Sequence, residues 1–152
     1  MTKKVPTTNN ELEPVACVCY RLRRAARVAA KAYDNALKPS GLRNTQFTLL
    51  ATLNRLGETS IGDLAEDLAV DGSTLTRNLE VLVRRGLVEN IVADDARVRY
   101  VRITKLGKQT YKEAVPLWRH AQRQALDGLA PKRWAAMRAE LGRFESACAR
   151  LT

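Results

Sequence analysis

Residues 73–78 place five hydrogen-bonding side chains within less than two helical turns. These side chains are Ser73, Thr74, Thr76, Arg77 and Asn78. Leu75, Leu79 and Leu82 recur at the spacing of one buried helix face, which leaves the polar five on the outside. An arginine can donate two hydrogen bonds to a guanine edge, an asparagine can pair with adenine, and hydroxyls at a helix N-terminus suit phosphates. These residue types indicate a helix that enters the major groove of DNA.

Three short helices are predicted around this segment. Apolar periodicity marks residues 45–56, 61–68 and 73–85, and turns that contain glycine separate them. Ser60, followed three residues later by Asp63, is typical of a capping box at a helix start. Two short helices joined by a tight turn form a helix-turn-helix, whose second helix reads the major groove. Because Ser and Thr at a helix start also serve as ordinary caps, the hydroxyls at positions 73 and 74 keep a purely structural alternative.

A β-hairpin is predicted directly after the last of these helices. Residues 87–92 and 98–103 alternate or cluster like strands, and the loop between them carries Arg97. A short loop with an arginine at its tip suits the minor groove, and Arg99 follows on the same edge. Two further cations continue along this edge, Arg102 and Lys105. We expect this hairpin to be a wing that contacts DNA, with an ordinary turn closed by aspartates as the alternative.

Long helices are predicted on both sides of this unit. Residues 12–38 repeat small apolar side chains, mostly alanine, at helical spacing. A helix of this kind needs a close-packed partner. A second copy of the chain is the simplest choice. Residues 106–126 form another helical stretch that Thr104 caps and that Pro116 should kink. Residues 132–150 predict a last helix.

Composition narrows the class of protein. The chain has 152 residues, 26 Lys and Arg against 16 Asp and Glu, and a net charge of +10, which predicts a polyanionic partner. There is no run of about 20 apolar residues and no secretory signal, so a cytoplasmic protein that does not enter the membrane is expected. A single histidine, His120, is poor material for a zinc site or a catalytic triad, and three cysteines are too few for a disulfide framework. We therefore expect a protein that is not an enzyme and that needs no cofactor or metal.

The ordered motifs resemble the MarR/SlyA family of regulators over essentially the whole chain. The matching pieces are Gly41-Leu42, Thr45-Gln46-Phe47, Ile61-Gly62-Asp63-Leu64-Ala65, Ser73-Thr74-Leu75-Thr76-Arg77, Arg85-Gly86-Leu87-Val88, Asp95-Ala96-Arg97 and Val101-Arg102-Ile103-Thr104 with Gly107. Ala96 departs from the pattern, since the family often has an arginine there. The resemblance implies a mainly α (α+β) fold, a winged helix-turn-helix with long N- and C-terminal dimerisation helices.

The resemblance also implies an organisation of the chain. We expect a flexible arm over residues 1–10 and a single domain over residues 11–152. Within that domain, residues 11–38 and 105–152 would be the dimerisation helices, and residues 45–104 the DNA-binding lobe.

What the resemblance implies for function is a homodimeric regulator of transcription. Such a dimer would bind a pseudo-palindromic operator in double-stranded DNA, act as a repressor, and leave the DNA when a small aromatic effector or an oxidant arrives. The alternative is an architectural DNA-binding protein with little sequence preference and no effector, which the same basic charge would serve. A shallow preference between operator and random DNA would favour that alternative.

Three thiols are candidates for sensing an oxidant. Cys19 resembles the reactive thiol of the family's peroxide-sensing branch, and Tyr33 matches one of the tyrosines that orient it. Cys17 and Cys19 cannot chelate one metal ion if both are helical, whereas a Cys-x-Cys pair before the helix could bind a soft ion. Neighbouring arginines favour a thiolate, and Cys148 in the last helix is a possible resolving thiol. The alternative is that these cysteines are small core residues.

Three ring side chains lie in the helix that carries Pro116: Tyr111, Trp118 and His120. They are candidates for lining an effector pocket between the long helices and the lobe. Aromatic residues at helical spacing are more often part of a core, so this alternative stays open.

Overall fold

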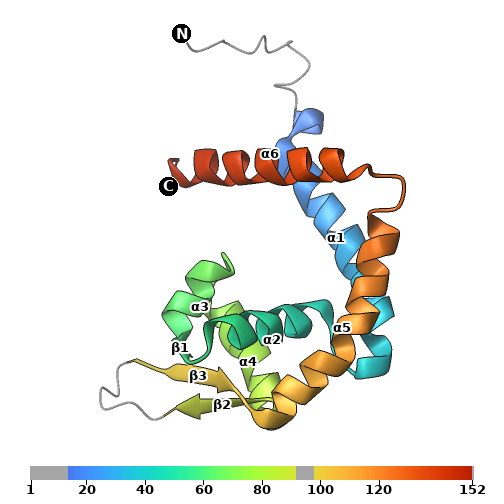
Figure 1. Ribbon diagram of the computed structural model, residues 1–152. Coiled ribbons are helices and arrows are strands. Elements are labelled where there is room, and N and C mark those ends of the chain that lie inside the picture. Colours follow the sequence, from blue (N-terminus) through green and yellow to red (C-terminus); the bar gives the residue numbers. More distant parts are fainter. Residues whose placement is uncertain (1–13, 92–97, 152) are drawn as a thin grey trace.

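The computed structural model describes residues 14–91 and 98–151, so the predicted arm over residues 1–10 and the predicted wing residue Arg97 lie outside the described residues. In chain order the elements are η2 Pro14–Ala16, α1 Val18–Leu37, η3 Lys38–Ser40, α2 Asn44–Leu56, β1 Thr59–Ser60, α3 Ile61–Asp67, α4 Gly72–Arg84, β2 Val88–Ile91, β3 Tyr100–Ile103, α5 Lys105–Ala125 and α6 Pro131–Ala149. Helices predominate and one small sheet is present (Figure 1). The predicted mainly α winged helix-turn-helix class is confirmed.

The core lies where α2, α3 and α4 meet the sheet and the long helices. Its fully buried side chains are Leu37, Leu50, Leu53, Leu64, Leu75, Leu82, Val88 and Val101. Leu75, Leu79 and Leu82 are all buried, which confirms the predicted inner face of α4. Because that face is fixed against the core, the opposite face of α4 is turned toward solvent.

The sheet has three antiparallel strands in the order β1-β3-β2. Val88 pairs with Ile103 and Ile91 with Tyr100, which is the register of the predicted hairpin. The additional strand β1 was not predicted, because two residues are too few to show a pattern. It pairs Thr59 with Val101 and so attaches the start of α3 to the wing.

The turn between α3 and α4 differs from the prediction. Gly72 is the first residue of α4, and the left-handed position is taken by Ala69 at φ +49°. The amide of Val70 donates to the carbonyl of Ala65 at 3.0 Å, and the amide of Ala69 donates to that of Glu66 at 3.0 Å. These two bonds form a Schellman motif, which satisfies the last carbonyls of α3 and holds a non-glycine residue in the left-handed region.

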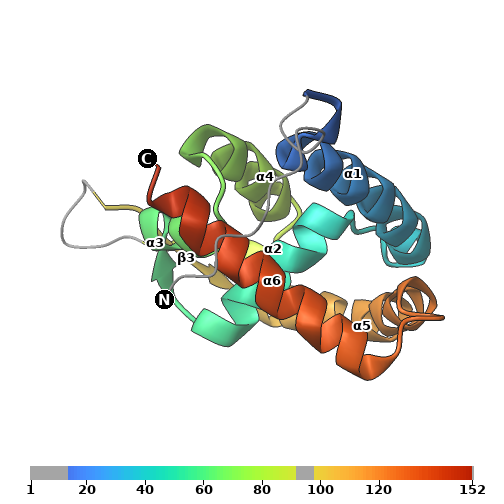
Figure 2. The same cartoon turned by 90° about the horizontal axis from the view of Figure 1, so that it is seen from above.

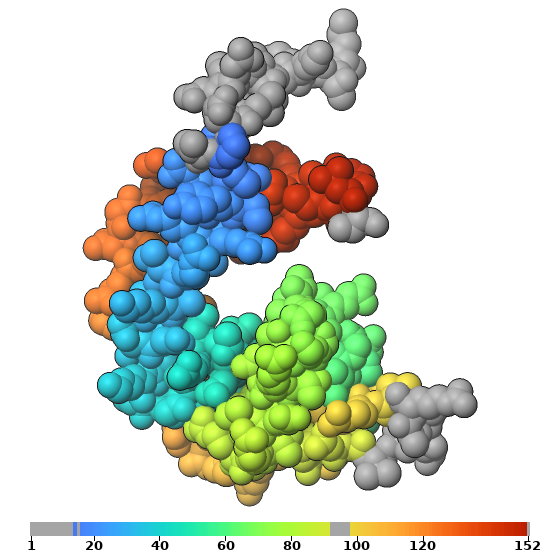
Figure 3. Space-filling model, turned by 180° about the vertical axis from the view of Figure 1, so that it is seen from behind, coloured from blue at the N-terminus to red at the C-terminus, as the bar shows by residue number. Residues whose placement is uncertain are grey.

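The long helices extend away from the lobe. α5 runs along the outer edge of the molecule from the base of the wing and changes direction along its length, as expected of a helix that contains Pro116 (Figure 1). α1 packs beside α5, and Figure 2 separates α1 from α6, which overlap in the first view. α6 has no buried residue and stands clear of the lobe, which gives the chain the outline of an open C (Figure 3).

Candidate nucleic-acid interface

The exposed face of α4 presents two cations, Arg77 and Arg84, for which the described residues provide no hydrogen-bond or ion-pair partner. Arg77 is exposed, and no hydrogen bond or ion pair joins its guanidinium to a residue in the described part of the chain. It lies two residues after buried Leu75, so the helix itself directs it away from the core. Its five N–H groups are therefore free for an external acceptor such as a guanine edge or a phosphate.

The N-terminus of α4 is capped by Asp71 rather than by Ser73, near which the helix was predicted to open. The carboxylate of Asp71 accepts the amide of Thr74 at 2.8 Å, the hydroxyl of Ser73 at 2.6 Å and the hydroxyl of Thr74 at 2.6 Å. These bonds, that from Ser73 first, hold the pKa of the Asp71 carboxyl well below its usual range. In the free protein, the two hydroxyls predicted to contact DNA are thus donating to the cap.

Thr76 and Asn78 also bond within α4. The hydroxyl of Thr76 donates to the carbonyl of Gly72 at 2.8 Å, and the amide nitrogen of Asn78 donates to the carbonyl of Thr74 at 3.0 Å. Both carbonyls already belong to the helix, so these side chains can exchange such bonds for DNA acceptors at small cost. Of the five predicted α4 residues, Ser73, Thr74 and Arg77 are thus exposed, whereas Thr76 and Asn78 are half-buried.

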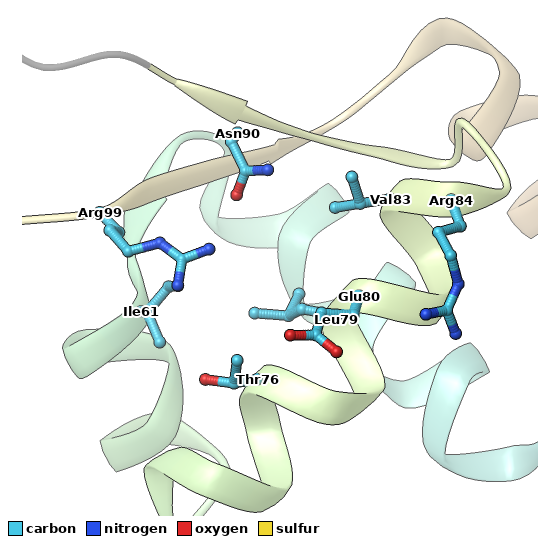
Figure 4. Close-up of a pocket in the computed structure, with 8 residues that line it drawn as sticks. All are labelled: Ile61, Thr76, Leu79, Glu80, Val83, Arg84, Asn90 and Arg99. Atoms are coloured by element: carbon cyan, nitrogen blue, oxygen red, sulfur yellow. The ribbon is translucent and has the colours of Figure 1, made fainter.

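A cavity of about 160 Å³ lies between α4, the strands and the start of α3 (Figure 4). Its lining residues are Ile61, Thr76, Leu79, Glu80, Val83, Arg84, Asn90 and Arg99. Figure 4 shows the guanidinium of Arg99 directed into the space between the strands and α4. The carbonyl of Arg99 accepts the amide of Ile61 at 2.9 Å, so the backbone of this predicted wing residue is fixed while its charge stays exposed.

Not all of the cations along the edge of the wing are free of carboxylate partners. Arg102 donates from Nε to Glu89 on the neighbouring strand at 2.7 Å, and Glu58 lies 3.9 Å from its other end. These carboxylates raise the pKa of the Arg102 guanidinium and partly neutralise its charge. Arg99 and Lys105 have no such partner in the part of the chain that the structure describes.

The residues proposed to sense an oxidant do not all lie together within one chain. α1 begins between Cys17, which is its N-cap residue, and Cys19, and both are exposed, whereas Cys148 in α6 is half-buried. Tyr33 lies fourteen residues after Cys19, about 21 Å along the helix axis. It donates its hydroxyl hydrogen bond to Gln122 of α5, and burial raises the pKa of that hydroxyl. One chain alone therefore does not bring Tyr33 to Cys19.

The aromatic residues of α5 join the lobe to the long helices. Phe47 of α2 stacks on Trp118 with ring centres 5.8 Å apart and contacts Tyr111 at 5.3 Å. The same three side chains border an open groove of about 410 Å³. They are thus part of the packing between lobe and α5 and also reach a surface where a small molecule has access. His120 is exposed elsewhere on α5.

Residues 14–91 and 98–151 contain neither a cluster of metal-ligating side chains nor a helix suited to cross a membrane. Within those ranges, no three side chains of the metal-ligating types gather in one place. Nor does any helix of the described chain combine the length and the apolar character that crossing a membrane requires.

Comparison with known proteins connects this geometry to a family. The sequence model of the MarR family matches residues 40–97. The uncharacterized HTH-type transcriptional regulator YxaD of Bacillus subtilis is 32% identical over 100 residues, which cover 65% of this chain and 70% of that protein. A second such regulator of that species, YwoH, is 29% identical over 94 residues, covering 62% of this chain and 69% of its own.

Solved structures agree with this result. The transcriptional regulator MosR of M. tuberculosis, crystallised in complex with DNA, has a TM-score of 0.76 and 42% identity, and the match covers 87% of this chain and 98% of that one. A mutant MarR from E. coli, complexed with operator DNA, has a TM-score of 0.78 at 21% identity, and the match covers 91% and 99% of the two chains. That second likeness concerns the fold alone.

Proposed function

Because the chain belongs to the MarR family of transcriptional regulators, we propose that it is a homodimeric repressor that binds a pseudo-palindromic operator. The observation that carries this proposal is α4, with its leucine face buried and the free guanidinium of Arg77 on the opposite face. The 42% identity to MosR, which was crystallised with DNA, supports the same conclusion. The family and these relatives are transcriptional regulators and not enzymes.

Each predicted contact residue has a distinct role in this proposal. Arg77 and Asn78 hydrogen-bond to base edges in the major groove. Three hydroxyl side chains of α4 donate to phosphates next to the helix N-terminus, namely Ser73, Thr74 and Thr76. Arg97 and Arg99 place the wing in the adjacent minor groove, where narrow A·T-rich DNA attracts guanidinium groups.

Dimerisation is supported by apolar surface that one chain leaves uncovered. α6 has Trp134, Leu141, Phe144 and Cys148 at spacings of seven, three and four residues, all half-buried, while Leu151 beyond it is exposed. The alanine-rich α1 is likewise largely exposed. We propose that residues 11–38 and 105–152 cover each other in two copies and that residues 45–104 form the DNA-binding lobe. Light scattering during gel filtration is expected to give twice the mass of 17.0 kDa.

Two kinds of signal have structural support. Cys19 is exposed in the first turn of α1, where a peroxide can reach its thiol. The groove beside Phe47, Tyr111 and Trp118 lies at the contact between lobe and α5, so a bound aromatic molecule would change the position of the lobe. Only some distances between the two lobes fit successive major grooves, which couples either signal to DNA affinity.

The redox signal has a direct test. Organic peroxide should release wild-type protein from the operator and leave the Cys19→Ser variant bound, at equal salt. Equal behaviour of the two proteins would assign the thiol to packing, and titration with small aromatic acids would then examine the groove.

The DNA upstream of the protein's own gene offers the test of the main proposal. Footprinting should show two protected half-sites whose centres are about 10 base pairs apart, with two chains bound per site. Uniform protection without preferred positions would instead support the architectural alternative, for which the net charge of +10 is the supporting observation.

A further inference from the structure

The positive charge of the chain does not lie in the lobe that carries α4 and the wing. Residues 45–104 contain seven Lys and Arg against nine Asp and Glu, a net charge of −2. Residues 1–44 and residues 105–152 each have a net charge of +6. Since the attraction of a protein to DNA grows with the phosphates that its cations neutralise, the net positive charge available for this attraction lies outside residues 45–104.

α5 gathers part of this charge into a row along one face, here termed the α5 ridge. Its members are Lys105, Lys108, Lys112, Arg119 and Arg123. At 3.6 residues per turn they lie within an arc of about 60° and extend over about 27 Å of the helix. All five are exposed, whereas Gly107, Ala114 and Ala121 on the other side of α5 are buried.

The α5 ridge has no carboxylate to balance it. None of its five side chains forms an ion pair in the described part of the chain, although Arg55 pairs with Asp67 and Arg102 with Glu89 elsewhere. The single acidic residue of α5, Glu113, points off the ridge and accepts a hydrogen bond from Gln109 at 3.1 Å. Like charges three or four residues apart repel and destabilise a helix, as do those at 105 and 108, 108 and 112, and 119 and 123. An external polyanion would remove this repulsion.

The α5 ridge begins at the lobe that carries α4 and the wing. Lys105 directly follows Thr104, whose hydroxyl donates to the carbonyl of Gly86 at the end of α4 at 2.7 Å. From this point α5 rises along the outer edge of the molecule, as Figures 1 and 3 show from opposite sides. The ridge is therefore attached rigidly to the lobe and leads away from it.

We propose that the α5 ridge is a second DNA-binding surface, which binds the phosphate backbone of duplex DNA outside the operator without regard to sequence. This inference rests on the proposed function, because α4 must first bring the protein to DNA. The phosphates are those that flank the operator on the same duplex, and capture of a second duplex is the competing outcome of the test. Cations that contact only phosphates raise the affinity for DNA but do not discriminate between base sequences.

The test compares two triple variants that lose the same charge. The ridge variant is Lys108→Gln, Lys112→Gln and Arg119→Gln, and the control is Arg24→Gln, Arg27→Gln and Lys31→Gln on the exposed basic face of α1. Binding to duplexes of about 20 and about 60 base pairs, both centred on the operator, is measured by fluorescence anisotropy over a range of salt concentrations.

The ridge variant should bind the long duplex at least about 10-fold more weakly, with a salt slope smaller by about 2.7 for three lost phosphate contacts, and bind the short duplex like wild type. Because α1 and α5 both lie in the proposed dimerisation helices, light scattering first verifies that both variants remain dimers, and the control should then match wild type on both duplexes. If operator-bound protein captures a labelled random duplex, the ridge bridges two duplexes. If it captures none and the ridge variant still binds the long duplex more weakly than wild type does, the ridge contacts the flanks.

Two results would overturn the assignment: a ridge variant that binds the long duplex like wild type, or an equal loss in the control. Failure of the proposed function is a separate observation, since wild type would then not distinguish operator from random sequence. In that case the ridge is still tested on random duplexes of the two lengths.

Discussion

The hydroxyl of Thr104 donates a hydrogen bond to the carbonyl oxygen of Gly86 at 2.7 Å, across 18 residues of chain. The same hydroxyl oxygen accepts the amide of Gly107 at 3.0 Å and so caps α5. Gly86, at φ +68°, is the left-handed residue that ends α4. One side chain thus fixes the end of the proposed recognition helix, the last residue of the wing and the start of α5 relative to each other.

Replacement of Thr104 by alanine should lower the free energy of unfolding by about 1–2 kcal/mol, because one cap and one bond between elements are lost. Thr104→Ser keeps the hydroxyl and should remain close to wild type. Urea unfolding at equal protein concentration checks this, and the midpoint is expected to fall with an unchanged slope. Equal midpoints for Thr104→Ala and wild type would contradict the role of this hydroxyl.

Gly107 is required for the close approach of α5 to the lobe. A Cβ atom at this position would lie 2.0 Å from the carbonyl oxygen of Leu87 and 2.8 Å from a side-chain carbon of Ile103. Gly107→Ala should therefore cost about 3 kcal/mol or more, or prevent folding. Gly142 in α6 has no atom within 4 Å of such a Cβ, and Gly142→Ala should be neutral or stabilising by about 1 kcal/mol. Thermal unfolding of both variants separates the two cases, and similar midpoints would contradict the close approach.

The cap of α4 should make stability depend on pH. The pKa of Asp71 is lowered in the folded protein by hydrogen bonds from Ser73 and Thr74, so its carboxylate stabilises the fold at pH values above the unfolded value of about 4. This contribution is lost as the pH falls from about 4 toward the lower folded pKa. Asp71→Asn keeps a capping group but cannot ionise. The difference in unfolding free energy between wild type and Asp71→Asn should be present at pH 7 and shrink below pH 4. A constant difference would exclude the carboxylate as its source.

The helices and the buried face of α4 could be predicted because the spacing of apolar residues along the sequence indicates which side chains face the core. The leucine face of α4 and the cap at Thr104 are predicted from the sequence and confirmed by the structure, since each depends on residues close in sequence. The family resemblance added the order of the elements, which the structure confirms, and the match of the MarR family model to residues 40–97 supports the family itself.

What the sequence did not reveal depends on contacts between side chains. The carboxylate of Asp71 engages Ser73 and Thr74, which the exposure of those hydroxyls alone could not show. The sequence places Arg102 on the basic edge of the wing, but the strand register sets it opposite Glu89, with which it forms an ion pair. Ala69 rather than a glycine takes the left-handed turn, because the bonds of the Schellman motif outweigh its steric cost.

The most direct test of sequence-specific recognition is the ratio of affinities for operator and random duplex, measured at fixed salt for wild type, Arg77→Ala and the control Arg143→Ala on α6. Arg77 is free and exposed on α4, so its loss should cost about 1–3 kcal/mol on the operator and lower the ratio by about 5- to 150-fold. The control should keep the wild-type ratio. An Arg77→Ala variant that weakens on both duplexes equally, or on neither, would contradict the account that α4 reads the operator through this residue.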